Sequence, residues 1–482
     1  MDKNKDITEF ISKLDQLRET EETEGKPNWI ITDENGKDHI AAIPLAKHLE
    51  EKHQYTFSQF SEHGYWFDTN NCQWKKRADQ AVQVDVKNAM LEVQKWNTGI
   101  HSSVCKLIEL DSRDLGEKDP FASPAPHKAV FRRKTYDLMN DTLEESRPEN
   151  RILQNHDYDL DMDHSAPCWN RLLNESLVIK DSEKAGEHDP KAVETLKTFI
   201  GYALIGNYKD FQHYVLLYGP GGDGKSTFLN WLTQIVGVQN TSNVSLEALT
   251  NSEKSKFAIA KLYQKSLNVY ADISDKFMDQ TAMVKTLSGG DRIEAQFKHK
   301  DLFEFANEAK LIFSCNSLPS FKDFSDGMFR RPIIIEYHKV NGFKDKYNEA
   351  DLMNEIPAFA YDCMRTYKKA LDSGIFPITD YMDSVKKKWF ADNNKLEMWL
   401  IENCDFDSKH VDYKKHEETA TLYNNYRTYC QQNGVKPLSK PKFNRMLDQK
   451  GIKHNVAIKV NGHVKKGYKG IKRKVIYRTD LN

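Results

Sequence analysis

The chain has 482 residues, of which 39% are hydrophobic and 29% charged, a composition typical of a soluble globular protein with about two to four domains. No apolar run approaches membrane-spanning length and the seven cysteines form no CxxC pair, so we expect a cytoplasmic protein without a transmembrane helix, zinc ribbon or disulfide framework. The net charge of −1 hides an asymmetry, because residues 436–482 contain 14 Lys and Arg against 2 Asp and Glu, which predicts an anionic polymer as partner.

The N-terminal 125 residues are predicted to form a domain of short strands and helices. Residues 64–77 have the pattern of a β-hairpin, because two aromatic segments flank an Asp-Thr-Asn-Asn turn, and a helical pattern follows at residues 82–96. The stretch EKDPFASPAPHK is rich in proline and small residues and predicts a linker or a long loop at residues 117–128. The first 25 residues have the pattern of a polar helix or a tail.

Residues 126–206 are predicted to be mostly helical and to form a collar ahead of the next domain. Their last segment, DPKAVETLKTFIGYALIG, places Asp189 at the cap of a helix and Pro190 at its first position. Proline is tolerated there because the N–H groups of the first helical turn have no intrahelical partner in any case.

Residues 207–380 alternate between apolar strand patterns and helical patterns. The strand patterns are HYVLLYG at 213–219, SLNVYA at 266–271, AKLIFSCN at 309–316 and PIIIEY at 332–337. Because strands that alternate with helices form parallel sheets, we expect an α/β fold in which helices cover both faces of the sheet.

The first of these strands leads into GPGGDGKST, which satisfies the pattern G-x-x-x-x-G-K-[ST] between a strand and a helix. Glycines let backbone N–H groups converge on a β-phosphate, and the helix that follows directs its positive end there. Lys225 is expected to reach the β- and γ-phosphates, and the Ser226 hydroxyl to bind Mg²⁺. The candidate ligands of the nucleotide are Gly219, Pro220, Gly221, Gly222, Asp223, Gly224, Lys225, Ser226 and Thr227.

Polar residues also adjoin the other strand patterns of this region. Asp272 directly follows SLNVYA, where an acid can hold the Mg²⁺ of a bound triphosphate, and Asp275 is either a further acid or a helix cap. Asn316 ends AKLIFSCN and either orients a water or senses the γ-phosphate, or is a turn residue. Arg330 and Arg331 precede PIIIEY, either as surface charge or as arginines that stabilise transition-state charge on a neighbouring subunit's nucleotide.

In this order, the segments GPGGDGKST, YADIS, LSGGDRIEAQFKHKDLFEF, LIFSCNSLP and DGMFRRPIIIEY resemble the superfamily 3 helicase core. The resemblance is to the branch of phage, plasmid and genomic-island replication proteins, to which the poxvirus replication helicase–primase is also similar, and it covers residues 131–337. It implies an AAA+-type ATPase that uses ATP and Mg²⁺, forms a ring, usually a hexamer, and moves 3′→5′ on single-stranded DNA. Host or element replication proteins would be further partners.

The resemblance also implies roles for single residues. By this resemblance, Lys225 and Ser226 are the P-loop pair and Asp272 is the acid of the second motif. Asn316 is the sensor, and Arg330, with Arg331 beside it, is the trans-acting arginine finger.

One position departs from the family's pattern. Many superfamily 3 proteins have two adjacent acids at the second motif, whereas Ala271 occupies the first of these positions here. The catalytic base is therefore Asp272 in a double role, or Asp275, or a water network.

The segment between Gly290 and Phe305 resembles the family's central-channel hairpin. RIEAQF and DLFEF have the apolar alternation of paired strands, and the tip between them would present Lys298, His299 and Lys300. Cations on such a hairpin can bind successive phosphates of a single strand without reading its sequence. The other interpretation is a solvated hairpin tip.

The C-terminal residues 381–482 are predicted to end in a winged helix. TATLYNNYRTYCQQNG is an amphipathic helix that ends at Gly434. A second, basic helix is expected to be capped by Ser439 and to turn inward Phe443, Met446 and Leu447.

A strand, the turn Asn461-Gly462, a basic loop and a last strand are predicted after this helix. A basic helix followed by a basic hairpin suits docking in the DNA major groove with a wing on the backbone, although a protein-docking module has the same outline. The candidate DNA contacts are Lys440, Lys442, Arg445, Lys465, Lys466 and Arg473.

The sequence thus predicts an ATP-dependent replicative DNA helicase or replication initiator of a mobile genetic element, which acts as a homo-oligomer on single-stranded and forked or origin DNA. Its expected parts are an N-terminal domain (1–125), a helical collar (126–206), an AAA+ core (207–380) and a winged helix (381–482). Two alternatives stay open: an ATP-switched origin-binding initiator that melts DNA without processive unwinding, and a P-loop small-molecule kinase.

Overall fold

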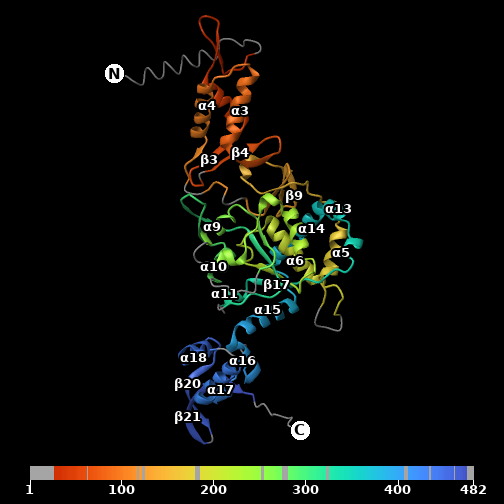
Figure 1. The fold of residues 1–482 in the computed structure, drawn as a ribbon, viewed down its shortest axis with the longest axis vertical. Helices are drawn as coiled ribbons and strands as arrows, with labels where there is room; N and C mark the ends of the chain where they lie inside the picture. Colours follow the sequence, from red (N-terminus) through yellow and green to blue (C-terminus); the bar gives the residue numbers. More distant parts are fainter. Residues whose placement is uncertain are drawn as a thin grey trace, which may run out of the picture. The chain divides into compact units, whose positions relative to one another are not determined.

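The computed structural model describes residues 26–61, 63–116, 119–121, 125–179, 185–250, 255–273, 281–321, 325–406, 411–433, 436–460 and 462–474. Predictions on the first 25 residues, Asp275, Gly434 and Asn461 lie outside these ranges. The chain divides into two compact units, Met1–Asp159 and Leu160–Asn482 (Figure 1). No helix within the described ranges is both long and apolar enough to cross a membrane.

The first unit begins with strands and helices that share one core. The strands are β1 (Ile30–Thr32), β2 (Asp38–Ile40), β3 (Gln54–Ser58), β4 (His63–Asp68), β5 (Gln73–Lys76) and β6 (Arg113–Asp114), and the helices are α2 (Ala42–Lys52), α3 (Ala78–Glu92) and α4 (Thr98–Asp111). The predicted hairpin is confirmed as β4 and β5, which pair antiparallel in the sheet β5-β4-β3-β6. The predicted helix is confirmed as α3, which starts and ends a few residues earlier, and Val82 and Val86 of α3 share a buried core with Val104 of α4.

The expectation that residues 126–206 are mostly helical is wrong for their first part. This part forms a four-stranded sheet in the order β10-β7-β8-β9, built from β7 (Lys128–Phe131), β8 (Lys134–Asp137), β9 (Thr142–Glu145) and β10 (Asn155–His156), with the 3-10 turn η1 (Pro148–Asn150) before β10. Its apolar runs are short and separated by charged turns, one of which places Arg132 at a φ of 49°. Periodicity alone does not distinguish a strand from a short buried helix in runs of this length, and here pairing with neighbouring strands decides for strands.

The second unit opens with α5 (Pro167–Ser176) and α6 (Pro190–Ile205). The predicted cap of α6 is confirmed, because the Asp189 carboxylate accepts hydrogen bonds from the N–H groups of Lys191 at 3.1 Å and Ala192 at 3.0 Å. Such a cap satisfies two donors that the first helical turn leaves open.

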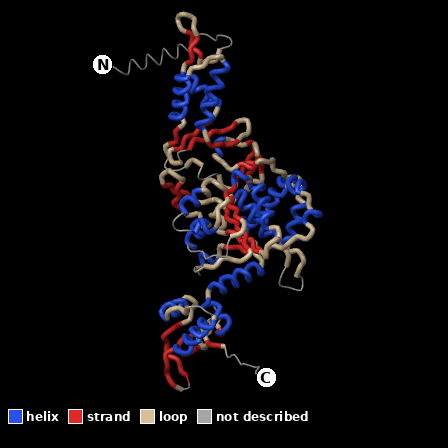
Figure 2. Tube along the Cα trace, viewed as in Figure 1, coloured by secondary structure: helices blue, strands red, loops and turns tan. Residues whose placement is uncertain are grey.

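The predicted parallel sheet is confirmed in the second unit. Five parallel strands lie in the order β12-β13-β16-β11-β17. They are β11 (Tyr214–Tyr218), β12 (Thr241–Ser242), β13 (Leu267–Tyr270), β16 (Lys310–Cys315) and β17 (Pro332–Glu336). Figure 2 shows helices on either side of these strands, which agrees with the nearly continuous burial along β11, β16 and β17.

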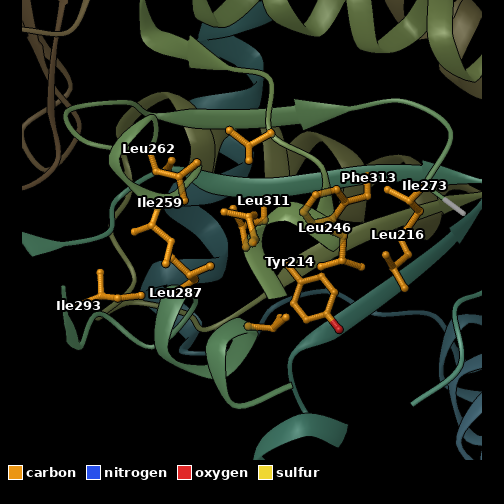
Figure 3. Packing of buried hydrophobic residues seen from close by; sticks show 14 of the residues in the cluster. Tyr214, Leu216, Leu246, Ile259, Leu262, Ile273, Leu287, Ile293, Leu311 and Phe313 are labelled. Carbon is orange, nitrogen blue, oxygen red and sulfur yellow. The ribbon is translucent and has the colours of Figure 1, made fainter. Parts of the chain in front are cut away.

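One large apolar cluster covers a face of this sheet. It is contributed by the central strands and by α8 (Leu246–Thr250), α9 (Ser255–Ala260), α10 (Thr281–Leu287) and the hairpin β14 (Arg292–Gln296) and β15 (Leu302–Ala306). Figure 3 shows side chains of the strands, among them Leu216, Leu311 and Phe313, packed together with Leu246 and Ile259 of the helices. Burial of these side chains fixes the hairpin and the sheet as parts of one core.

The remaining helices of the sheet region are α7 (Lys225–Val236), α11 (Asp326–Phe329), α12 (Phe343–Lys346), α13 (Glu349–Asn354), α14 (Ile356–Ser373) and α15 (Asp380–Asn393), with a 3-10 turn η2 (Val238–Asn240). Gly201 of α6 lies against α14 so closely that a Cβ there would stand 2.2 Å from the Cys363 carbonyl oxygen. A glycine is therefore required where these two helices cross.

The C-terminal part has its own core. It comprises α16 (Lys395–Asn403), β18 (Cys404–Asp405), β19 (His416–Glu418), α17 (Thr419–Gln432), α18 (Lys440–Asp448), β20 (Lys453–Val460), β21 (His463–Lys469) and β22 (Lys472–Arg473). Trp399, Tyr426 and Phe443 meet in its centre. The segment predicted as a basic loop after the Asn-Gly turn is instead the strand β21. It pairs with both β20 and β19, and the pairing with β19 could not be read from the local sequence.

A half-buried histidine makes the stability of the second unit sensitive to acid. Burial lowers the pKa of His213 from 6.5 to about 4, and its Nδ1 lies 3.1 Å from the Arg331 carbonyl oxygen. The folded protein therefore keeps this ring neutral while the unfolded chain protonates it. We expect stability to fall by at most about 3 kcal/mol as the pH drops from 6.5 to 4.

The measurement is urea-induced unfolding across this pH range, with His213→Asn as the matched variant because its amide nitrogen can still donate to the Arg331 carbonyl. The variant should show a shallower loss of stability on acidification. An identical pH dependence in both proteins would contradict the assignment to His213.

Candidate functional site

The segment GPGGDGKST forms the loop between the central strand β11 and helix α7. Gly221, Gly222 and Gly224 have φ angles of 93°, 63° and 94°, in the left-handed region that favours glycine. A Cβ at Gly219 would stand 2.1 Å from an Asp223 carboxylate oxygen. The glycines are thus needed for the shape of the loop, and Ser226 and Thr227 are exposed on the first turn of α7.

Lys225 is buried and held by three oxygens. Its Nζ lies 2.6 Å from Oδ2 of Asp223, 2.9 Å from the Gly219 carbonyl oxygen and 3.3 Å from Oδ1 of Asn316. Lys225 and Asp223 are each only 3% exposed at their side chains. The structure thus brings together two predicted site residues that are far apart in sequence, Lys225 at the start of α7 and Asn316 directly after β16.

Asp272 follows β13 at the same edge of the sheet. Its φ of 54° is in the left-handed region, and its N–H donates to the hydroxyl of the buried Ser314 at 3.1 Å. Burial raises the pKa of Cys315 to about 12, while the charge of Lys225 lowers it and that of Asp272 raises it. Because β11, β13 and β16 are parallel, Asp272 and the glycine-rich loop both follow the carboxyl ends of strands at one edge of the sheet. Sequence reasoning missed Ser314, since a serine within an apolar strand gives no signal of its own.

Ser226 on the first turn of α7 and Asp272 after β13 are the two predicted metal ligands. Both side chains belong to exposed residues, and Mg²⁺ is commonly bound by one or two such oxygens together with substrate phosphates. Within the described ranges there is no group of three or more His, Cys, Asp and Glu that could hold a metal ion by itself. The donor set therefore fits a metal that arrives with a phosphate ligand.

Arg330 and Arg331 lie at the opposite edge of the sheet, ahead of β17. Arg330 is exposed and donates a hydrogen bond to the side chain of Gln212. Arg331 is 7% exposed and donates to the Gly327 carbonyl. The two arginines differ in role: Arg330 faces solvent, whereas Arg331 supports the turn before β17.

The predicted hairpin tip is confirmed as the connection between the antiparallel strands β14 and β15. Lys298, His299 and Lys300 are all exposed there, and His299 has a φ of 64°. Aromatic rings pack against the hairpin. The ring centroids of Phe297 and Phe303 are 4.9 Å apart in a stacked arrangement, and those of Tyr263 and Phe303 are 5.1 Å apart. The three basic residues are therefore exposed at a tip whose strands are packed by aromatic side chains.

The predicted basic residues of the C-terminal part are not equivalent. Those of α18, namely Lys440, Lys442 and Arg445, are exposed, as is Lys466. Lys465 is exposed too, but its ammonium lies 3.0 Å from a Glu418 carboxylate oxygen, and Arg473 lies 3.2 Å from one of Glu417. Because adjacent residues of a strand point to opposite faces, Lys466 lies on the face of the sheet opposite to Lys465 and Glu418.

A cavity of about 400 Å³ lies beside the glycine-rich loop and was not predicted from the sequence. It is lined by residues 222–224 of the loop and by Leu172, Trp231, Tyr337, Val340 and Phe343. These apolar residues come from α5, α7 and the segment after β17, so no single motif contains them. In the sequence, the signal for this cavity is the presence of apolar and aromatic residues directly after PIIIEY, among them Val340 and Phe343.

The chain is similar to several known proteins. A family of unknown function, DUF5906, matches residues 217–331, from the end of β11 to the start of β17. Putative helicase L207/L206 of Acanthamoeba polyphaga mimivirus is 27% identical over 152 residues, which are 31% of this chain and 16% of that protein. Putative helicase 184R of Invertebrate iridescent virus 6 is 24% identical over 336 residues, 66% of this chain and 33% of that protein.

Among solved structures, the A form of the apo NrS-1 C-terminal region has a similar fold, with a TM-score of 0.50 and 14% identity over 88% of this chain and 97% of that one. The fold and the loop define an α/β protein with a P-loop sequence in a parallel sheet. More particularly, the chain is a relative of viral proteins named putative helicases, of which it spans a third or less.

Proposed function

We propose that the chain is an ATP-dependent DNA helicase that drives or initiates replication of a mobile genetic element, as a ring of identical subunits, usually six, that moves 3′→5′ on single-stranded DNA. The observation that carries the proposal is the arrangement on one sheet. Lys225 contacts Asn316 at the carboxyl edge, where Asp272 also follows a strand, while Arg330 and the basic hairpin belong to the amino edge. The names of the viral relatives support the same class.

The chemistry at the carboxyl edge is phosphate binding and hydrolysis. Lys225 would exchange Asp223 for the β- and γ-phosphates of ATP, and the loop N–H groups would surround the β-phosphate. Mg²⁺, held by Ser226 and Asp272, would neutralise charge on the phosphate oxygens. Asn316, already within reach of Lys225, is placed to orient a water or to sense the γ-phosphate.

The amino edge supplies the argument for subunit cooperation. Five residues of β17 separate Arg330 from the edge where the glycine-rich loop lies, a span of roughly 16 Å. An arginine side chain cannot cover that distance. If Arg330 stabilises charge on a γ-phosphate, the nucleotide must belong to a neighbouring subunit, as in ring ATPases with trans-acting arginines.

DNA would be held at two places. The hairpin residues Lys298, His299 and Lys300 would bind the backbone of one strand. We propose that α17, α18 and the sheet β19-β21-β20 act as a winged helix, with α18 in the major groove and Lys466 on the backbone. The sheet with its helices would correspond to an AAA+-type core.

The test is ATP hydrolysis and strand separation on a forked duplex, with Lys298→Ala compared against Lys209→Ala, an exposed lysine in the turn after α6. The wild type should hydrolyse ATP faster with single-stranded DNA and separate the fork. Lys298→Ala should lose DNA stimulation and strand separation by about tenfold or more, because a phosphate contact is removed. Lys209→Ala should behave as the wild type.

The outcomes separate the alternatives. ATP hydrolysis without strand separation would favour the ATP-switched origin-binding initiator. A monomer whose ATPase ignores DNA and tolerates Arg330→Ala would favour a small-molecule kinase. Equal behaviour of Lys298→Ala and Lys209→Ala would remove the hairpin from the mechanism.

A further inference from the structure

The segment between α6 and β11 contains a glutamine whose side-chain amide contacts two separate parts of the second unit. The Nε2 of Gln212 lies 3.3 Å from the carbonyl oxygen of Gly289, in the turn between α10 and the first strand of the basic hairpin, β14. Its Oε1 accepts a hydrogen bond from the guanidinium of the exposed Arg330. Gln212 therefore joins the start of the hairpin to the arginine proposed to act on a neighbouring subunit's nucleotide.

The two partners fix the orientation of the Gln212 amide. A guanidinium only donates hydrogen bonds and a backbone carbonyl only accepts them, so a single orientation of the amide satisfies both contacts. Glutamine has a donor and an acceptor on one planar group, whereas the carboxylate of glutamate has acceptors alone. Glutamine is therefore suited to hold Arg330 and Gly289 at the same time.

The backbone on both sides of Gln212 is held by hydrogen bonds. The carbonyl of Phe211 accepts one from the hydroxyl of the buried Tyr202. On the other side, the Nδ1 of His213 lies 3.1 Å from the carbonyl oxygen of Arg331. Because its two neighbours are fixed in this way, Gln212 extends its side chain from a defined position.

The turn that contains Gly289 is tied to both strands of the hairpin. A Cβ at Gly289 would stand 2.8 Å from the Lys285 carbonyl oxygen, so the turn packs tightly against the end of α10. Directly after β15, the Nδ2 of Asn307 donates to the Leu287 carbonyl at 2.8 Å. A displacement of the hairpin would therefore also move the Gly289 carbonyl.

We propose that Gln212 is the residue that positions Arg330 in response to DNA on the hairpin. Without DNA, the amide holds Arg330 on its own subunit, as in the structure described here. When a single strand displaces the hairpin, the amide follows the Gly289 carbonyl, its Oε1 withdraws from Arg330, and the guanidinium is released toward the neighbouring subunit's γ-phosphate. The inference rests on the proposed function and names how DNA regulates its nucleotide site.

The test measures kcat for ATP hydrolysis by the full chain with and without single-stranded oligo-dT, in the wild type and two variants of Gln212. Gln212→Glu keeps an acceptor for Arg330 and strengthens it with a charge, but removes the donor to Gly289. Its kcat should stay at the unstimulated value of the wild type whether or not the strand is present. Gln212→Met removes both contacts, so its kcat without the strand should rise to the stimulated value of the wild type and respond no further.

Affinity for the strand, measured by fluorescence anisotropy of labelled oligo-dT, should be the same in both variants and the wild type, because the residues of the hairpin tip are untouched. The matched controls are Gln234→Glu and Gln234→Met, at an exposed glutamine in the last turn of α7. Both should keep the DNA stimulation of the wild type.

The outcomes separate this inference from the proposed function. Stimulation by DNA that is the same in the wild type and the Gln212 variants would overturn the role of Gln212 and leave the helicase proposal intact. Weaker binding of the strand by the Gln212 variants would assign the effect to the structure of the hairpin and would also overturn that role. A wild type whose ATP hydrolysis does not respond to the strand would overturn the proposed function and this inference together.

Discussion

Lys225→Ala is expected to reduce ATP hydrolysis at least about a hundredfold, the usual scale for removing a group that stabilises charge in a transition state. The same change should also destabilise the fold. The Asp223 carboxylate is buried and lies 2.6 Å from the Lys225 ammonium, so removal of the lysine leaves a buried charge without its partner. Breaking a buried pair in this way costs about 3–5 kcal/mol.

Lys225→Ala/Asp223→Ala is the matched double variant. Because it removes both charges, it should recover most of the lost stability while it stays inactive. Steady-state ATP hydrolysis and urea-induced unfolding of the wild type, the single variant and the double variant separate the two effects. Unchanged stability of Lys225→Ala would contradict the buried ion pair, and ATP hydrolysis by the double variant would contradict the role of Lys225.

Asp272→Asn is expected to lower kcat for ATP hydrolysis by about 100-fold or more while ATP binding is largely kept. The lost carboxylate is one of the two side chains proposed to hold Mg²⁺. Asparagine tolerates the left-handed backbone at this position, where φ is 54°, so the fold should be unaffected. Asp272→Ala should lose the same activity and in addition about 1 kcal/mol of stability.

Asp275→Asn is the control for the open question of the catalytic base. Rates of ATP hydrolysis as a function of Mg²⁺ concentration distinguish the two acids. Loss of activity in Asp275→Asn but not in Asp272→Asn would assign the metal and the base to Asp275. Loss of ATP hydrolysis in both variants would indicate that Asp272 and Asp275 share the metal-binding and base roles. In proteins with an acid in the place of Ala271, two adjacent acids have these roles.

The parts of the site that follow from local chemistry could be predicted from the sequence. A glycine-rich loop between an apolar strand and a helix has few possible conformations, and three of its glycines have the positive φ angles that such a loop needs. The same holds for the Asp189 cap and for four of the five parallel strands, whose apolar runs of four to six residues alternate with helices. These features depend on neighbours within a few residues of one another.

The strands of the sheet at residues 128–156 could not be predicted from the local sequence pattern. The short apolar runs around Phe131 and Tyr136 are compatible with more than one local structure, and pairing with β10 and β9 decides for strands. The same reason applies to Lys465 and Lys466, which are adjacent and both basic in the sequence. Both are exposed, and only the register of β21 against β19 and β20 places Lys465 beside Glu418 and Lys466 on the opposite face.

The sequence by itself therefore determined the glycine-rich loop, the parallel α/β sheet and the identity of the polar residues that adjoin its strands. Only the tertiary structure decided which of these residues meet. It brought Asn316 to Lys225, put Arg330 at the far edge of the sheet, tied Asp223 to Lys225, and assembled a cavity from Leu172, Trp231 and Phe343. The physical reason is that backbone periodicity encodes the structure of a segment, whereas contacts between distant segments depend on strand order and on how side chains fill the space between layers.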